Sequence, residues 1–206
     1  MSMNKKFILL APVIVLALAS TIFLTTTMAS KNDQVSATSN ACLPTTLDSV
    51  TFKYPIKQPV MDPILTGYKL QAVDQNAADV FLWYSDHPLC QVHGLPDELY
   101  RGSILVIAAY NPNMGDSATE AQKELNNLKG STAKLQMIDV NGYKGIGWEP
   151  FQGADVVKLN GTVLDSKPIP MPGRVEFFND HDKTWYSVSG MRSMNELLQI
   201  ALTIPK

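Results

Sequence analysis

The densest set of side chains that could do chemistry lies between residues 85 and 93, in the sequence Ser-Asp-His-Pro-Leu-Cys-Gln-Val-His. His87, Cys90 and His93 follow one another at three-residue steps, and both Zn²⁺ and copper accept imidazole and thiolate ligands. A copper site of the cupredoxin type would also need a methionine shortly after a Cys-x-x-His pattern, and residues 95–99 contain none. One interpretation of this segment is therefore a metal-binding or redox site.

Cys90 has a second interpretation, because the chain holds only one other cysteine, Cys42. Two cysteines in an exported chain are expected to pair in an oxidising compartment. In the chain-entropy model, a bridge that closes a loop of this length stabilises a fold by roughly 3–4 kcal/mol. Because a paired thiol cannot also bind a metal, we favour a Cys42–Cys90 disulfide and predict neither a metal site nor a cofactor.

Nucleophilic catalysis would need a serine or cysteine beside a histidine and an orienting acid. The chain has three histidines and none lies near a Gly-x-Ser-x-Gly elbow. The sequence Asp180-His181-Asp182 is typical of a solvated hairpin tip, and nothing marks the neighbouring carboxylates Asp97 and Glu98 as a glycosidase pair. We therefore predict no catalytic residue.

The first 29 residues indicate where the protein works. Lys5 and Lys6 precede an uninterrupted apolar run over residues 7–24, and the next charged residue is Lys31. We expect residues 1–29 to be a signal peptide, cut after small residues such as Ala19 or Ala29, or an uncleaved membrane anchor. In both cases the paired lysines hold the N-terminus in the cytoplasm and the body is extracytoplasmic.

The remaining chain divides into a tether and one domain. Residues 30–49 are rich in Ser, Thr and Asn, and we expect a polar tether. Residues 50–206 have the size of one domain, within a chain of 206 residues that is 45% hydrophobic. The net charge of −2 becomes −4 when Lys5 and Lys6 are left out, since 15 bases then face 19 acids. An acidic body argues against nucleic acid as the partner.

The hydrophobic pattern of the domain is mainly that of strands. A period of two, or an apolar run of strand length, predicts strands over 67–74, 78–85, 102–110, 135–140, 143–148, 155–164, 174–179 and 183–189. Residues 50–63 are interrupted by proline and predict an irregular or edge segment. Capping boxes at Ser117 and Ser193 predict two helices, the second with a continuous apolar stripe to Ile204. We therefore predict an α+β fold, a curved antiparallel sheet packed by two helices.

Two further features of this domain have alternative interpretations. Asn160-Gly161-Thr162 is a glycosylation sequon, but Asn-Gly is also a strong hairpin-turn signal, which we favour. Many aromatic side chains stand on the predicted strands, where they indicate ordinary sheet core, or an apolar cleft or a patch for a partner. These aromatic residues are Phe81, Trp83, Tyr84, Trp148, Phe151, Phe177, Trp185 and Tyr186.

The order of these segments resembles a known family. Val80-Phe-Leu-Trp-Tyr84, Gly102-Ser-Ile-Leu-Val106 and Asn141-Gly-Tyr-Lys-Gly145 precede Arg174-Val-Glu-Phe-Phe178, and the tail runs from Lys183-Thr-Trp-Tyr-Ser-Val-Ser-Gly190 to Ser193-Met-Asn-Glu-Leu-Leu-Gln-Ile-Ala201. From about residue 66 onward this resembles the domain of unknown function at the C-termini of some anti-sigma-type and lipoprotein-carrier-like exported proteins.

The resemblance implies a curved sheet whose concave apolar face holds acyl chains or contacts a partner. It carries no catalytic signature, and only six residues precede the apolar run, so we expect no cytoplasmic signalling domain. Together with the leader, the resemblance predicts a non-catalytic, extracytoplasmic, membrane-tethered domain that binds an apolar ligand or lipid. The alternatives are a protein-interaction module at the cell surface and, less favoured, the metal-binding or redox protein.

Overall fold

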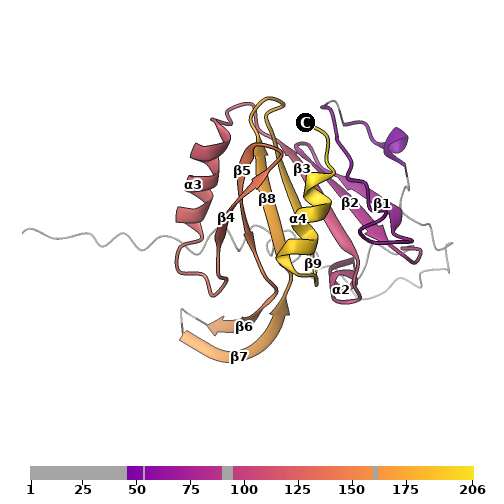
Figure 1. Ribbon diagram of the computed structural model, residues 1–206. Helices are drawn as coiled ribbons and strands as arrows, with labels where there is room; N and C mark the ends of the chain where they lie inside the picture. The colour runs from indigo at the N-terminus through magenta and orange to yellow at the C-terminus, as the bar shows by residue number, and fades with distance from the viewer. Residues whose placement is uncertain (1–45, 53, 90–94, 160–161) are drawn as a thin grey trace, which may run out of the picture.

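Seven antiparallel strands form one open sheet in a computed structural model that describes residues 46–52, 54–89, 95–159 and 162–206. The strand order is β1-β2-β3-β9-β8-β5-β4, and β6 and β7 form a separate two-stranded ribbon (Figure 1). The prediction of an α+β domain built mainly on antiparallel strands is confirmed. The described elements are η1 (Leu47–Ser49), β1 (Lys69–Gln75), β2 (Asp79–Ser85), α2 (Leu95–Tyr100), β3 (Ile104–Tyr110), α3 (Ser117–Asn127), β4 (Gln136–Val140), β5 (Tyr143–Trp148), β6 (Phe151–Leu159), β7 (Thr162–Met171), β8 (Gly173–Asn179), β9 (Thr184–Gly190) and α4 (Met194–Leu202).

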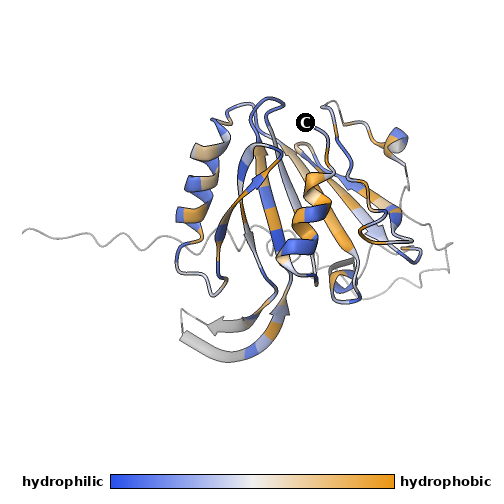
Figure 2. Ribbon diagram, viewed as in Figure 1, coloured by the Kyte–Doolittle hydropathy of each residue, from blue (hydrophilic) through white to orange (hydrophobic). Residues whose placement is uncertain are grey.

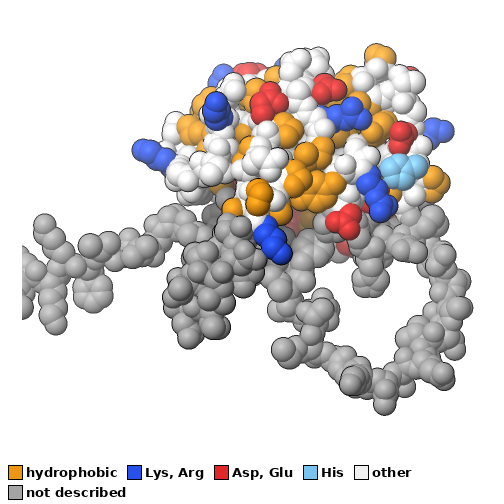
Figure 3. Space-filling model, turned by 90° about the horizontal axis from the view of Figure 1, so that it is seen from below, with side chains coloured by type: hydrophobic (Ala, Val, Ile, Leu, Met, Phe, Trp, Pro, Cys, Tyr) orange, Lys and Arg blue, Asp and Glu red, His pale blue; other side chains and the backbone are white. Residues whose placement is uncertain are grey.

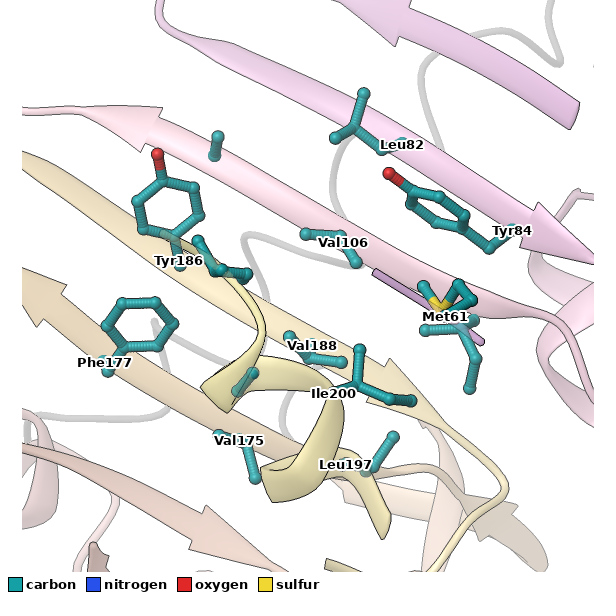
Figure 4. Packing of buried hydrophobic residues seen from close by; sticks show 14 of the residues in the cluster. Met61, Leu82, Tyr84, Val106, Val175, Phe177, Tyr186, Val188, Leu197 and Ile200 are labelled. Atoms are coloured by element: carbon teal, nitrogen blue, oxygen red, sulfur yellow. The ribbon is translucent and has the colours of Figure 1, made fainter. Parts of the chain in front are cut away.

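One face of the sheet, here called the front face, carries the main hydrophobic core. Successive side chains of a strand point to opposite faces, so that Phe177 of β8 faces the front and Phe178 faces the back. Helix α4 and an N-terminal strap, residues 50–52 and 54–65, cover the front face. Figure 4 shows α4 lying over the strands, with Leu197 and Ile200 directed at Val175 and Val188.

The front core leaves little of its surface in contact with water. Leu197, Ile200 and Tyr186 are fully buried, and Met61 of the strap is 5% exposed. The strap is also tied down by polar contacts, because the amide of Val60 donates to Oγ1 of Thr203 at 2.8 Å. The prediction of an irregular segment over residues 50–63 is confirmed for its described residues, and Phe52, Ile56 and Met61 pack in the core, whereas Val60 is exposed.

Local sequence signals explain how the two longer helices begin. The capping box predicted at Ser193 is confirmed, since Ser193 Oγ accepts from the amide of Glu196 and Glu196 Oε2 accepts from the amide of Ser193. The box predicted at Ser117 is wrong by one residue. Asp116 is the N-cap and accepts from the amide of Thr119 at 2.9 Å, because an aspartate directly before a serine offers the better acceptor.

Two separate clusters cover parts of the back face. Helix α3 packs over β5 and β8, where Ala121 contacts the side chains of Ile146 and Phe178. The second cluster lies on the back face of β2 and β3. There, Leu99 of helix α2 packs with Trp83 and Leu105. Figure 2 shows the mixed hydropathy of α3, whereas α4 is hydrophobic over most of its length. Helix α2 is absent from the sequence prediction, because six residues are too few to show a helical period.

The strand predicted over residues 155–164 is wrong. The chain reverses between β6 and β7, which pair antiparallel from Phe151 and Met171 to Leu159 and Thr162. The favoured hairpin interpretation of Asn160-Gly161 agrees with this pairing, although residues 160 and 161 themselves lie outside the described part of the chain. The ribbon stands away from the large sheet (Figure 1).

Candidate functional site

The back face carries a polar group where a buried sheet face would ordinarily be apolar. Arg174 and Glu176 alternate along β8, and Ser187 and Ser189 alternate along β9. The register places Arg174 directly opposite Ser189 and Glu176 directly opposite Ser187, so that the four side chains form one contiguous set. We call these four residues the back-face polar group.

Three of the four members of the back-face polar group are buried, whereas the side chain of Arg174 is 27% exposed. Glu176 is 2% exposed, Ser187 is fully buried and Ser189 is 1% exposed. Arg174 Nη1 donates to Glu176 Oε1 at 3.0 Å, and the two serine Oγ atoms lie 3.4 Å apart. Burial raises the pKa of the Glu176 carboxyl above its usual value, and the opposing effect of Arg174 is smaller.

Arg174 still has hydrogen-bonding capacity. Its Nε is buried and has no hydrogen-bond partner among the described residues. The guanidinium lies over the ring of Trp148, with Cζ 5.4 Å from the ring centroid, a cation–π contact. A buried donor without an acceptor is costly in a folded protein, and is a reason to look for a ligand.

Apolar side chains extend the back-face polar group toward β2 and β3. Ile107 stands opposite Ser187 on one side and opposite Phe81 on the other. Ala109 follows Ile107 on the same face, and all three are partly exposed, in contrast to the front core. We call Phe81, Ile107 and Ala109 the back-face apolar patch. Polar groups beside apolar surface are the usual composition of a binding site for a small or amphipathic molecule.

The aromatic residues predicted on the strands divide between the two faces. Tyr84, Phe177 and Tyr186 belong to the front core. All three tryptophans of the chain belong to the back-face clusters, Trp83 with α2 and the other two with α3. The prediction of ordinary sheet core is confirmed for the front face, and Trp83 and Trp148 are buried on the back face as well. The alternative of an apolar cleft or a patch for a partner stays a prediction.

The predicted metal site is described only in part. Cys42, Cys90 and His93 lie outside the described residues, as does Asn160, so neither the disulfide nor the metal set is defined. His87 is described, at the end of β2. Among the described residues, no group of three or more His, Cys, Asp and Glu side chains could hold a metal ion.

His87 is instead the centre of a hydrogen-bonded cluster. Its Nδ1 lies 2.7 Å from Oγ of Ser85 and 2.8 Å from Oδ1 of Asp86, and its Nε2 lies 2.9 Å from Oε2 of Glu98. Arg101 donates to the other oxygen of Glu98 at 2.9 Å. Hydrogen bonds that the carboxylates of Asp86 and Glu98 accept from its ring raise the pKa of His87. Figure 3, the view from below, shows hydrophobic side chains on the described surface with basic and acidic side chains around them, and a histidine at one edge.

Ser85, His87 and Glu98 have the residue types of a catalytic triad, but their arrangement suits a structural role. Ser85 is fully buried, and its Oγ already accepts from the amide of His87 at 3.1 Å. Nδ1 of His87 is shared between Ser85 and Asp86, and the buried Ser85 has no surface through which a substrate could reach its Oγ. We interpret the cluster as a clamp between β2 and α2.

The other candidates from the sequence do not join either cluster. His181 and Asp182 form a pair at 2.8 Å in the loop between β8 and β9, and Asp182 also bonds to Lys57 of the strap. Asp97 stands beside Glu98 in the sequence but is exposed. The hairpin-tip interpretation of residues 180–182 is therefore confirmed.

Sequence reasoning did not identify the back-face polar group. The signal was present in the alternation of Arg-x-Glu in one strand and Ser-x-Ser in the next, each flanked by buried residues. It became informative only with the strand order, which puts β8 and β9 in the interior of the sheet.

Comparisons with known proteins add no assignment, since no protein-family model, no curated protein and no solved structure matches the chain. Within the described ranges, no helix is both long and apolar enough to cross a membrane, and the apolar run over residues 7–24 lies outside them.

Proposed function

We propose that the chain is a non-catalytic, extracytoplasmic binding protein, tethered to the membrane through residues 7–29, whose back face binds an apolar or amphipathic ligand. The observation that carries the proposal is the back-face polar group, buried beside the partly exposed back-face apolar patch. We also propose that the domain is of the lipoprotein-carrier-like type and that its sheet is curved as in those proteins.

The site proposed differs from the concave apolar face that the resemblance alone implies. The front face is occupied by the protein's own side chains, with Leu197 and Ile200 packed on Val175 and Val188. A ligand there would have to displace α4 or the strap, at the cost of a large buried apolar area. On the back face, the back-face apolar patch is already partly exposed, so a ligand can contact it without displacing α4 or the strap.

Native mass spectrometry of the full chain, exported through its own leader and purified in mild detergent, tests the proposal. We expect an adduct of lipid size at one copy per chain, which solvent extraction then identifies. The variant Ile107→Asn should lose the adduct, because it places an amide in the back-face apolar patch. The matched variant Val60→Asn, at a residue 58% exposed on the strap, should keep it. A bare polypeptide in all three samples would overturn the proposal.

A protein-interaction module is the second candidate, and the ribbon of β6 and β7 favours it. A two-stranded ribbon on its own is marginally stable in water, so a ribbon that stands away from its sheet suits contact with a partner chain. In the same experiment, a second polypeptide bound at one copy per chain, without a lipid adduct, would decide for this candidate. A metal mass without a lipid would decide for the metal-binding alternative around His87, Cys90 and His93.

A further inference from the structure

Arg174 shows which part of a ligand the back-face site would recognise. A guanidinium has two edges suited to paired hydrogen bonds, and Arg174 uses only Nη1 for Glu176. The Nε atom, at the edge that carboxylates and phosphates commonly bind, is buried without an acceptor among the described residues. The cation–π contact with Trp148, 5.4 Å from Cζ to the ring centroid, is a second contact that positions the guanidinium.

The residues beside Arg174 supply further donors. Ser189 is directly opposite Arg174 in the sheet, and Ser187 is two residues along on the same face. Their hydroxyls bond only to each other, at 3.4 Å, among the described residues, so each keeps hydrogen-bonding capacity. Both side chains are buried, so an oxyanion reaches them only when neighbouring back-face side chains move aside. Two hydroxyls and a guanidinium edge together form a donor set for an oxyanion.

We propose that the free edge of Arg174, with Ser187 and Ser189, binds the anionic head of an amphipathic ligand, a carboxylate or a phosphate, whose hydrocarbon lies on Phe81, Ile107 and Ala109. This inference rests on the proposed function and adds the chemistry of the ligand. Two rows of paired residues cross β8, β9 and β3. One row is Arg174, Ser189 and Leu105, and the other is Glu176, Ser187 and Ile107. Each row has a charged residue on β8 and an apolar residue on β3.

The charge of the site is compatible with an anion. Burial raises the pKa of Glu176, which favours its neutral form and leaves the charge of Arg174 less fully balanced. Arg192 also has a buried Nε without a partner among the described residues, but its Nη2 donates to Tyr68 and its Nη1 lies 4.0 Å from Glu196, so both terminal nitrogens already have partners. Arg174 is therefore the arginine that combines a free edge with an apolar neighbourhood.

The three tryptophans provide a measurement specific to the back face, because bromine quenches indole fluorescence on contact and all three indoles lie on that face. The probes are 11-bromoundecanoic acid, 11-bromoundecyl phosphate and 11-bromoundecanol, added to the full chain. We expect the acid or the phosphate to quench at concentrations at least about tenfold below the alcohol, as charge-assisted hydrogen bonds predict.

The matched variants are Glu176→Gln and the double variant Arg174→Gln with Glu176→Gln, which avoids leaving a buried carboxylate unpaired. Glu176→Gln should keep the preference for the anionic probes. The double variant should lose it while binding the alcohol unchanged. If the double variant does not fold, Ser187→Ala with Ser189→Ala should weaken only the anionic probes, by roughly tenfold for two lost hydrogen bonds.

The outcomes separate this inference from the proposed function. Equal quenching by acid, phosphate and alcohol, or a preference that survives the double variant, overturns the anionic head and leaves the binding function standing. Quenching by none of the probes, together with a bare chain in mass spectrometry, overturns both. Displacement of the acid by acetate or inorganic phosphate at equal concentration would show that a small anion suffices, and would overturn the amphipathic ligand.

Discussion

The imidazole of His87 joins β2 to α2, because its Nε2 lies 2.9 Å from Oε2 of Glu98 while its Nδ1 remains with Ser85 and Asp86 at the strand end. Glu98 is in turn bonded to Arg101. Helix α2 is only six residues long, and its Leu99 packs with Trp83 and Leu105. The contact between His87 and Glu98 is therefore a main attachment of α2, which borders the proposed ligand site.

This attachment should weaken as the pH rises. Hydrogen bonds to Asp86 and Glu98 raise the pKa of His87 above its usual 6.5, so the folded state binds the proton more tightly than the unfolded state. The stabilisation is complete below pH 6.5 and is lost as the pH rises through the raised pKa. We expect denaturant midpoints to fall between pH 6 and pH 8.5 in the wild type, and to fall less in His87→Gln. An equal fall in both proteins would contradict the clamp, and His181→Gln controls for removing a histidine.

The buried carboxyl of Glu176 gives a second pH dependence of the same sign. Its pKa is raised above 4.5 by burial, so stability is highest below that pH and falls as the pH rises through the raised pKa. Glu176→Gln keeps an acceptor for Arg174 Nη1 and cannot ionise. We expect the variant to lose this part of the decline between pH 4.5 and 8, measured by urea unfolding. A loss of about 3 kcal/mol or more at every pH would instead show that the ion pair is indispensable.

The close approach of β5 and β8 depends on Gly145. A Cβ at this position would overlap the carbonyl oxygen of Glu176 and lie 2.9 Å from Cα of Phe177. We expect Gly145→Ala to destabilise the fold by about 3 kcal/mol, the upper range for overpacking. In the matched variant Gly142→Ala, the added Cβ meets no atom within 4 Å. Only the positive φ of +94° disfavours the alanine, and we expect a loss of roughly 1–2 kcal/mol. Equal losses in thermal unfolding would contradict the β5–β8 register.

Filling of the front face by α4 can be tested in the same way. Leu197 is fully buried against the sheet, whereas its neighbour Leu198 is partly buried. Leu197→Ala should cost about 2–5 kcal/mol and Leu198→Ala clearly less, because only the first leaves a cavity in the core. Urea unfolding of both variants measures the difference. Similar small losses would mean that the front face is loosely packed and open to a ligand.

Local patterns were sufficient for much of the fold. The positive φ angles of Asn141 and Gly142 in the β4–β5 turn, and the capping box of α4, follow from residues adjacent in the sequence. The predicted extent of the strands failed where the pattern was ambiguous, as in the apolar residues on both sides of Asn160. Helix α2 was missed because its six residues, which include Pro96, are too few to show a helical period.

The candidate site was predicted poorly for a different reason. Alternation along β8 shows that Arg174 and Glu176 share a face, but it does not show that the face is buried or which strand lies beside it. That information comes from the pairing of β9 with both β3 and β8. His87 was identified as chemically notable, yet its partner Glu98 belongs to the helix that the pattern did not reveal.

A crystal structure of the full chain with the ligand that co-purifies with it tests the central claim most directly. We predict density on the back face, with an acidic head beside Arg174, Ser187 and Ser189 and hydrocarbon over Phe81 and Ile107. Density between α4 and the front face, with the strap displaced, would contradict the account and restore the concave-face arrangement of the lipoprotein carriers.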